Sequence, residues 1–199
     1  MQKINYFILL SILIGIFLVS CSNDTPIPKP KTYFRMSVPE PEYEKFDTLN
    51  MPFTFMYPNY GVIERDNRKF KHDNWFNINF PQYGCKLYFS LMQINSKLTL
   101  DTLINDSYNF TTEHRNFSNG IREKEFTNEK ERIFANVFEI IGEKVASPYQ
   151  FFITDSTKYF LRGALYMEFK ANNDSLAPVL DRVKEDINNI ISTFAWKKD

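Results

Sequence analysis

The fold is decided by residues 174–194, Asp-Ser-Leu-Ala-Pro-Val-Leu-Asp-Arg-Val-Lys-Glu-Asp-Ile-Asn-Asn-Ile-Ile-Ser-Thr-Phe. Apolar residues recur at helical spacing and form one face: Leu176, Val179, Leu180, Val183, Ile187, Ile190, Ile191 and Phe194. The opposite face carries Asp181, Lys184, Glu185 and Asn188. This period predicts an amphipathic helix with Asp174 or Ser175 as its N-cap and Pro178 in its first turn. We expect the apolar face to pack on a sheet.

Segments of alternating apolar residues precede this helix, and several of them end at a proline. The predicted strands are Tyr33–Val38, Phe53–Tyr57, Asn74–Phe80, Cys85–Ile94, Ile121–Phe126, Arg132–Ile141, Pro148–Thr154 and Lys158–Phe169. The segment Thr99–Asn116 has a helical period instead, with Thr99 as its predicted N-cap. Because strands outnumber helices and are joined by short turns, we expect an α+β domain whose mainly antiparallel sheet is flanked by helices.

The N-terminus has the pattern of an export signal. Lys3 precedes an apolar run from Tyr6 to Val19, and the run ends in Leu18-Val19-Ser20-Cys21. This ending matches the lipobox of bacterial lipoproteins, in which the cysteine receives a lipid. A transmembrane helix would need about 20 apolar residues, and this run is shorter. The sequence therefore predicts removal of residues 1–20 and lipidation of Cys21.

The predicted signal is followed by a proline-rich stretch. Residues 21–32 contain three prolines and no apolar cluster, a composition typical of an extended tether. Residues 33–199 are enough for one α+β domain with one core. The chain carries 24 basic and 24 acidic residues, so its charge predicts no nucleic-acid partner. The membrane contact that we expect is through the lipid anchor.

Motifs of catalysis and cofactor binding are not found in the sequence, which has no HExxH, CxxC, GxSxG or glycine-rich phosphate loop. We therefore expect no catalytic residues, no cofactor and no metal site, and we interpret the chain as a non-enzymatic protein. Once Cys21 is lipidated, Cys85 has no partner within the chain, and its place in a predicted strand indicates a buried core residue. His72 and His114 stand apart among ordinary surface residues and are expected to be solvated.

Arg162 is the polar residue that stands out in the last predicted strand. It shares a face with Phe160, Ala164 and Tyr166. An arginine among aromatic rings can bind an acidic group of a partner, or it can pair within the fold with Glu168 or Asp155. The neighbouring Gly163 predicts a close approach by a helix or a side chain.

Several pieces of the chain, in their order and spacing, resemble the gliding motility lipoprotein GldD family of Bacteroidetes. The pieces are Pro28-Lys-Pro-Lys31, Tyr33-Phe-Arg35, Pro39-Glu40, Phe53-x-Phe-x-Tyr-Pro58, Ala146-Ser-Pro148, Gln150-Phe-Phe152, Thr154-Asp-Ser-Thr157, Phe160-Leu-Arg-Gly-Ala-Leu-Tyr166, Ala177-Pro-Val-Leu180 and Lys184-Glu-Asp-Ile187. We take Tyr33, Arg35, Gln150, Asp155 and Arg162 from these pieces as candidate interaction residues. The order of elements also resembles the layered Mog1/PsbP-like fold.

The family resemblance implies a part in surface gliding, with other gliding motility lipoproteins and components of type IX secretion as partners. It implies no catalytic residues. We expect the protein at the outer membrane, on the periplasmic face. An alternative interpretation is a small-ligand-binding module of the envelope, with a pocket lined by aromatic residues between sheet and helices.

Overall fold

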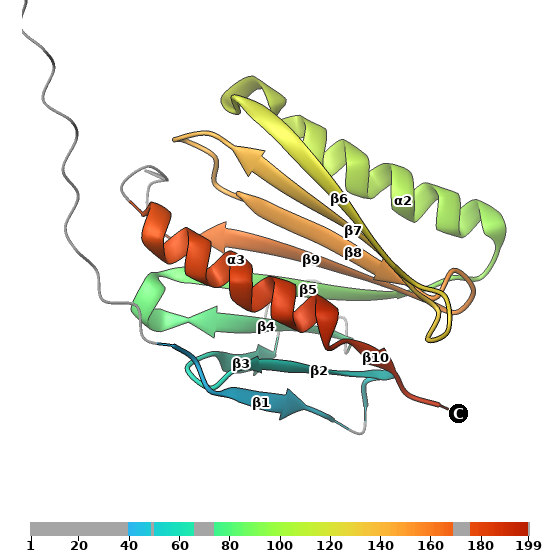
Figure 1. Cartoon of the computed structure of the whole chain (residues 1–199). Helices are drawn as coiled ribbons and strands as arrows, with labels where there is room; N and C mark the ends of the chain where they lie inside the picture. Colours follow the sequence, from blue (N-terminus) through green and yellow to red (C-terminus); the bar gives the residue numbers. More distant parts are fainter. Residues whose placement is uncertain (1–39, 49, 66–73, 169–175, 199) are drawn as a thin grey trace, which may run out of the picture. The chain divides into compact units, whose positions relative to one another are not determined.

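A seven-stranded antiparallel sheet forms the centre of the computed structural model, which describes residues 40–48, 50–65, 74–168 and 176–198. Its strand order is β3-β4-β5-β9-β8-β7-β6 (Figure 1). The strands are β3 (Val62–Arg65), β4 (Trp75–Phe80), β5 (Cys85–Gln93), β6 (Gly120–Asn128), β7 (Ile133–Ile141), β8 (Tyr149–Thr154) and β9 (Tyr159–Met167). All neighbouring pairs are antiparallel, which short connections between consecutive strands favour.

A second, three-stranded sheet has the order β1-β2-β10. It comprises β1 (Tyr43–Phe46), β2 (Phe53–Pro58) and β10 (Ala195–Trp196). The central strand β2 therefore pairs with a segment before it and with the end of the described chain.

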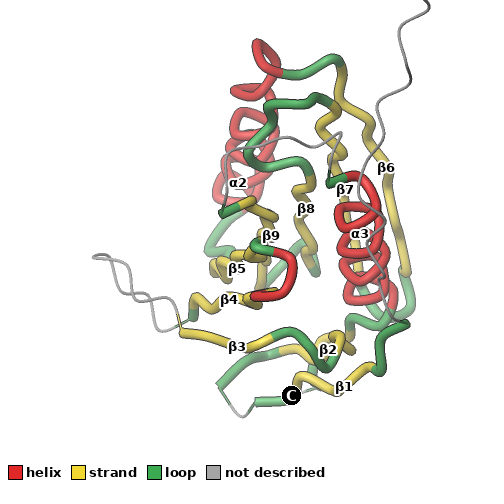
Figure 2. The backbone as a smooth tube through the Cα atoms, turned by 90° about the vertical axis from the view of Figure 1, so that its left-hand side faces the viewer, coloured by secondary structure: helices red, strands yellow, loops and turns green. Residues whose placement is uncertain are grey.

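The two α-helices of the described residues lie on opposite sides of the seven-stranded sheet (Figure 2). The helix α2 (Lys97–Thr112) is followed by the 3-10 turn η2 (Glu113–Phe117), and a shorter turn, η1 (Pro81–Tyr83), joins β4 to β5. The helix α3 (Ala177–Ser192) packs on the other face of the sheet. None of the helices among the described residues is long and apolar enough to cross a membrane.

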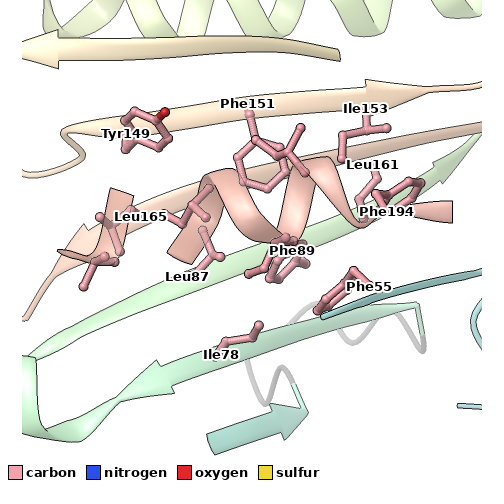
Figure 3. Packing of buried hydrophobic residues seen from close by; sticks show 14 of the residues in the cluster. Phe55, Ile78, Leu87, Phe89, Tyr149, Phe151, Ile153, Leu161, Leu165 and Phe194 are labelled. Atoms are coloured by element: carbon pink, nitrogen blue, oxygen red, sulfur yellow. The ribbon is translucent and has the colours of Figure 1, made fainter. Parts of the chain in front are cut away.

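The main core lies between α3 and the two sheets, where the apolar strand faces meet (Figure 3). Phenylalanine rings join the sheets: Phe46 stacks on Phe55 at 4.6 Å and on Phe76 at 4.8 Å, and Phe76 stacks on Phe89 at 4.5 Å. Each such pair adds about 0.5–1.5 kcal/mol beyond the burial of its area. The aromatic residues therefore hold the two sheets together.

Gly163 makes room for the ring of Phe151, another residue of the main core. A Cβ at this position would lie 2.2 Å from Cζ of Phe151, the residue directly opposite on β8. The predicted close approach is confirmed, and the partner is a side chain of the neighbouring strand. The exposed fractions of Val183, Ile187 and Ile190 are all 0%, which confirms the predicted apolar stripe of α3.

The fold class is confirmed: the domain is α+β, with mainly antiparallel sheets and two flanking helices. Sequence patterns did not predict β1, β3 or β10, which are only two to four residues long. The predicted N-cap of α2 was wrong by one turn. Ser96 occupies the cap, and its hydroxyl accepts a hydrogen bond from the N–H of Thr99 at 3.1 Å.

Lys184 is less exposed than its place on the polar face of the helix indicates. Its ammonium group contacts Glu139 at 2.6 Å, and its side chain is 21% exposed. The predicted strand Tyr33–Val38 lies outside the described residues. The predicted N-cap of α3, Asp174 or Ser175, was wrong, because Leu176 occupies the cap and makes no side-chain capping hydrogen bond.

Candidate functional site

The sheet face on the α2 side is only partly covered. The helix packs Leu100, Leu103, Ile104 and Tyr108 against Phe138, Phe152 and Phe160. Beyond this cluster an open hollow follows β5 and β9, with a volume of about 400 Å³. Its lining residues, which we call the Arg162 groove, are Tyr88, Ser90, Arg162, Ala164, Tyr166, Met167 and Glu168.

The strand register explains why a hollow forms there. Ser90 lies directly opposite Arg162, and Tyr88 lies directly opposite Ala164. Side chains directly opposite each other point to the same face of a sheet, so these residues lie together. Ser90 and Ala164 are small, whereas Tyr88 and Tyr166 are large and meet edge to face at 5.6 Å. The small side chains therefore leave a depression between the rings and the guanidinium group.

The Arg162 guanidinium is held by neutral partners. Its Nη2 donates a hydrogen bond to Oε1 of Gln150 at 2.6 Å, and its Cζ lies 4.7 Å from the centre of the Phe110 ring. Burial lowers its pKa, because a cation loses hydration in this position. Among the described residues, no carboxylate lies within ion-pair distance of Arg162.

The predicted pairing of Arg162 with Glu168 or Asp155 is therefore wrong for the described structure. Glu168 instead contacts Lys86 at 3.7 Å. It follows Arg162 by six residues, a separation of roughly 20 Å along an extended strand. The carboxylate of Asp155 is engaged in the β8–β9 turn, where its Oδ1 accepts hydrogen bonds from the N–H groups of Thr157, Lys158 and Tyr159.

Gln150 and Arg162, both predicted as interaction residues, are brought together, and they retain donors. The Gln150 side chain is 2% exposed, and its Nε2 has no hydrogen-bond acceptor among the described residues. The guanidinium group has five N–H donors, of which one is engaged by Gln150. Of these two residues only Arg162 lines the groove, so its spare N–H groups are the donors that an acceptor bound there would meet.

Among the described residues, Arg162 is the cation of the groove that has no ion pair with a carboxylate, although Glu113 acts on it electrostatically. Lys86, on the neighbouring strand β5, contacts Glu64 at 3.0 Å as well as Glu168. In the turn η2, directly after α2, His114 is half-buried, which differs from its predicted solvation. Burial lowers the pKa of His114, the charge of Arg162 acts in the same direction, and Glu113 opposes both.

The remaining candidate residues are not brought to the groove by the described structure. Cys21, Tyr33 and Arg35 lie outside the described residues, as does His72. Cys85 is fully buried, and burial raises the pKa of its thiol to about 12, so it is not a reactive thiolate. The described part of the chain holds no group of His, Cys, Asp and Glu side chains suited to a metal ion.

A buried carboxylate on α3 was not predicted from the sequence. Asp186 is 0% exposed and accepts hydrogen bonds from the hydroxyls of Tyr43, at 2.9 Å, and Tyr60. Arg182 contacts Asp186 at 3.1 Å and Glu40 at 3.3 Å. Burial raises the pKa of Asp186, while these donors act in the opposite direction. We call Glu40, Tyr43, Tyr60, Arg182 and Asp186 the entry clasp, because they attach the start of the described chain to α3.

The chain resembles known proteins in both sequence and fold. The model of the gliding motility lipoprotein GldD family matches residues 23–196. The chain belongs to this family. The match spans the described domain and begins two residues after Cys21, and it supports the resemblance found in the sequence. The family is described by motility and lipid attachment, and its name implies anchoring to a membrane. Comparison with curated protein sequences gives no significant match.

Solved structures with a similar fold include cyanobacterial PsbP from Synechocystis sp. PCC 6803. It shares 13% identity, with a TM-score of 0.49, and the match covers 82% of this chain and 97% of that chain. The Ran-binding protein Mog1p of Saccharomyces cerevisiae shares 9% identity, with a TM-score of 0.45, over 79% of this chain and 96% of that chain. At these identities the likeness concerns architecture alone and carries no information about function.

Proposed function

We propose that this protein is a non-enzymatic, lipid-anchored component of the gliding machinery that binds and stabilises other motility and type IX secretion components. The proposed location is the periplasmic face of the outer membrane. Family membership supports the motility role. The observation that carries the binding role is Arg162, a half-buried cation on an open sheet face that has spare donors and no carboxylate partner among the described residues.

The proposal is supported by what the described domain offers chemically. The thiol of Cys85 is buried, and the polar side chains of Ser90, Arg162 and Glu168 line an open sheet face. An open face of this kind can bind another molecule, and a non-enzymatic scaffold needs a binding surface and no catalytic group. We therefore assign the domain the role of a binding partner within an assembly.

The binding role is tested with the tagged full chain, purified from detergent-solubilised envelopes. We expect other motility lipoproteins or secretion components to co-purify, and their cellular abundance to fall when this protein is deleted. If the chain is recovered alone, and its deletion leaves the abundance of those components unchanged, the proposal is wrong. Native mass spectrometry that finds a retained small molecule in place of protein partners would favour a ligand-binding module.

The proposed anchor is tested at Cys21. We propose that residues 1–20 are removed, that residues 21–32 form a tether and that residues 33–199 form the domain. Metabolic labelling with an alkynyl palmitate analogue should tag the wild-type protein and not Cys21→Ala, which should leave the membrane fraction. The matched control is Cys85→Ala, which removes the buried cysteine and should be labelled like the wild type.

A further inference from the structure

We propose that the Arg162 groove binds the carboxylate of an acidic side chain presented by a protein partner. This inference rests on the proposed binding function and names the chemistry of its contact. The guanidinium of Arg162 would hold the carboxylate, and the rings around it would pack against the chain that carries the acid.

The donors of the groove match an acceptor-only group. Arg162 uses one N–H on Gln150 Oε1, and Gln150 Nε2 is buried without an acceptor among the described residues. Gln150 lies beneath the groove and is not one of its lining residues, so the donors that a ligand meets are the remaining N–H groups of Arg162. An ionised carboxylate donates no hydrogen bonds and accepts several, so it complements these N–H groups. Hydrogen bonds between charged partners are about twice as strong as those between neutral ones, and a guanidinium matches the geometry of a carboxylate.

The charge of the groove favours a single negative charge. Arg162 contributes one positive charge, whereas the neighbouring Lys86 is already paired with Glu64 and Glu168. Glu113 also interacts electrostatically with Arg162 from the end of α2. A group with two negative charges, such as phosphate, would be repelled by these acids. A carboxylate compensates the guanidinium without an excess of negative charge.

The rim of the groove indicates that the acid belongs to a polypeptide. Phe110 stacks on the guanidinium and is still 46% exposed, and Tyr166 is 38% exposed. A free small acid would reach Arg162 without covering these rings. A protein segment that inserts an acidic side chain would bury them, and aromatic and arginine residues of this kind dominate the binding energy of many protein interfaces.

The contact is tested by NMR on the full chain in detergent, with 15N-labelled arginine. The probe is N-acetylglutamate N-methylamide, and its glutamine counterpart and inorganic phosphate serve as comparisons. We expect the side-chain N–H signals of Arg162 to shift saturably with the glutamate probe alone, with a Kd of about 1 mM for a ligand of this size. An equal shift with the glutamine probe, a stronger shift with phosphate, or no shift at all would overturn the inference.

Variants connect this contact to the partner. Arg162→Gln should weaken capture of protein partners by about 10- to 100-fold, the loss expected for hydrogen bonds to a charged group. The matched control is Arg122→Gln, which removes the same charge from the exposed edge strand β6. Ser90→Leu is a second variant: it fills the hollow, leaves Arg162 in place and should also prevent capture. Melting temperatures close to that of the wild type would establish that both groove variants are folded.

The outcomes separate the two proposals. If the wild-type protein captures partners and both groove variants capture them equally well, the acidic contact is wrong, whereas the binding function stands. If the wild-type protein captures none, the binding function fails first. Loss of capture in both groove variants, with retention in Arg122→Gln, supports the acidic contact.

Discussion

The two faces of the seven-stranded sheet use alternate residues of the same strands, and they are covered to different extents. On the α3 side, Leu87, Phe89 and Leu165 are fully buried. On the α2 side, Tyr88 and Arg162 line an open groove. Both helices have 16 residues, so helix length does not explain the difference. The α3 side is also closed by the three-stranded sheet, whereas α2 covers its side alone.

This difference has a geometric cause. Seven strands spaced about 4.8 Å apart form a sheet about 29 Å wide, and one helix is only about 10 Å across. A single helix therefore leaves part of a wide sheet uncovered, and the uncovered part must carry residues compatible with water. Arg162 and the two tyrosines meet that need, and their arrangement forms the binding surface that we propose. We infer that stability depends mainly on the α3 face and recognition on the α2 face.

The largest difference between the two faces should be in the free energy of unfolding when one isoleucine of each helix is replaced by alanine. Ile187→Ala removes a side chain that is 0% exposed on the α3 side, and it should lower the free energy of unfolding by about 2–5 kcal/mol. The matched variant Ile104→Ala, in the half-buried α2 cluster, should lower it by only about 1 kcal/mol. Urea unfolding of both variants measures the difference, and equal losses would show that the two faces contribute alike.

The next effect concerns overpacking of the α3 face. Gly163→Ala places a Cβ against the Phe151 ring, so it should lower the free energy of unfolding by about 1–3 kcal/mol. Ala164→Gly, at the next position on the α2 side of the same strand, is the control for a general change in backbone freedom. Thermal unfolding compares them. A neutral Gly163→Ala would mean that the aromatic packing adjusts more readily than the close approach indicates.

A smaller loss is expected at the polar border of α3. Lys184→Ala removes the contact with Glu139 and should lower the free energy of unfolding by about 1 kcal/mol at most, because ion pairs near the surface contribute little. Adding salt should reduce the difference between variant and wild type. A loss as large as that of Ile187→Ala would show that α3 depends on its border as strongly as on its apolar face.

The smallest effect concerns His114, in the turn η2. Burial lowers its pKa in the folded state, so the unfolded chain binds a proton more readily. The contribution of His114 to stability is therefore present above the unfolded pKa of about 6.5, and it is lost as the pH falls through the folded value. Between pH 8 and pH 5.5, His114→Gln should lose about 1 °C less in melting temperature than the wild type. Identical pH profiles would place His114 in a fully solvated position.

The sequence predicted the long elements well because each has a clear period over many residues. The apolar stripe of α3 and the alternation of β5 and β9 specify their own faces, and these faces build the main core. The short strands β1, β3 and β10 have too few residues for a period and form through pairing with distant segments. Their existence depends on tertiary structure, which no local pattern contains.

The candidate site was predictable only in part. The place of Arg162 among aromatic residues on one strand face follows from alternation, and so does its role as a candidate. The partners of Arg162 could not be predicted from this alternation. The contact with Gln150 depends on the strand register, and the contact with Phe110 depends on the path of α2. Asp186 was missed for a similar reason: an acid in a helix is normally expected to face water, and only Tyr43, Tyr60 and Arg182 explain its burial.

The entry clasp has a mechanical consequence under the tether that we propose. A force applied to Glu40 along the chain would act first on its exposed contact with Arg182. The force would then act on Tyr43, whose hydroxyl donates a hydrogen bond to Asp186 on α3. Force would then be distributed into the helix and the main core, and the four-residue strand β1 would be protected from peeling away from β2.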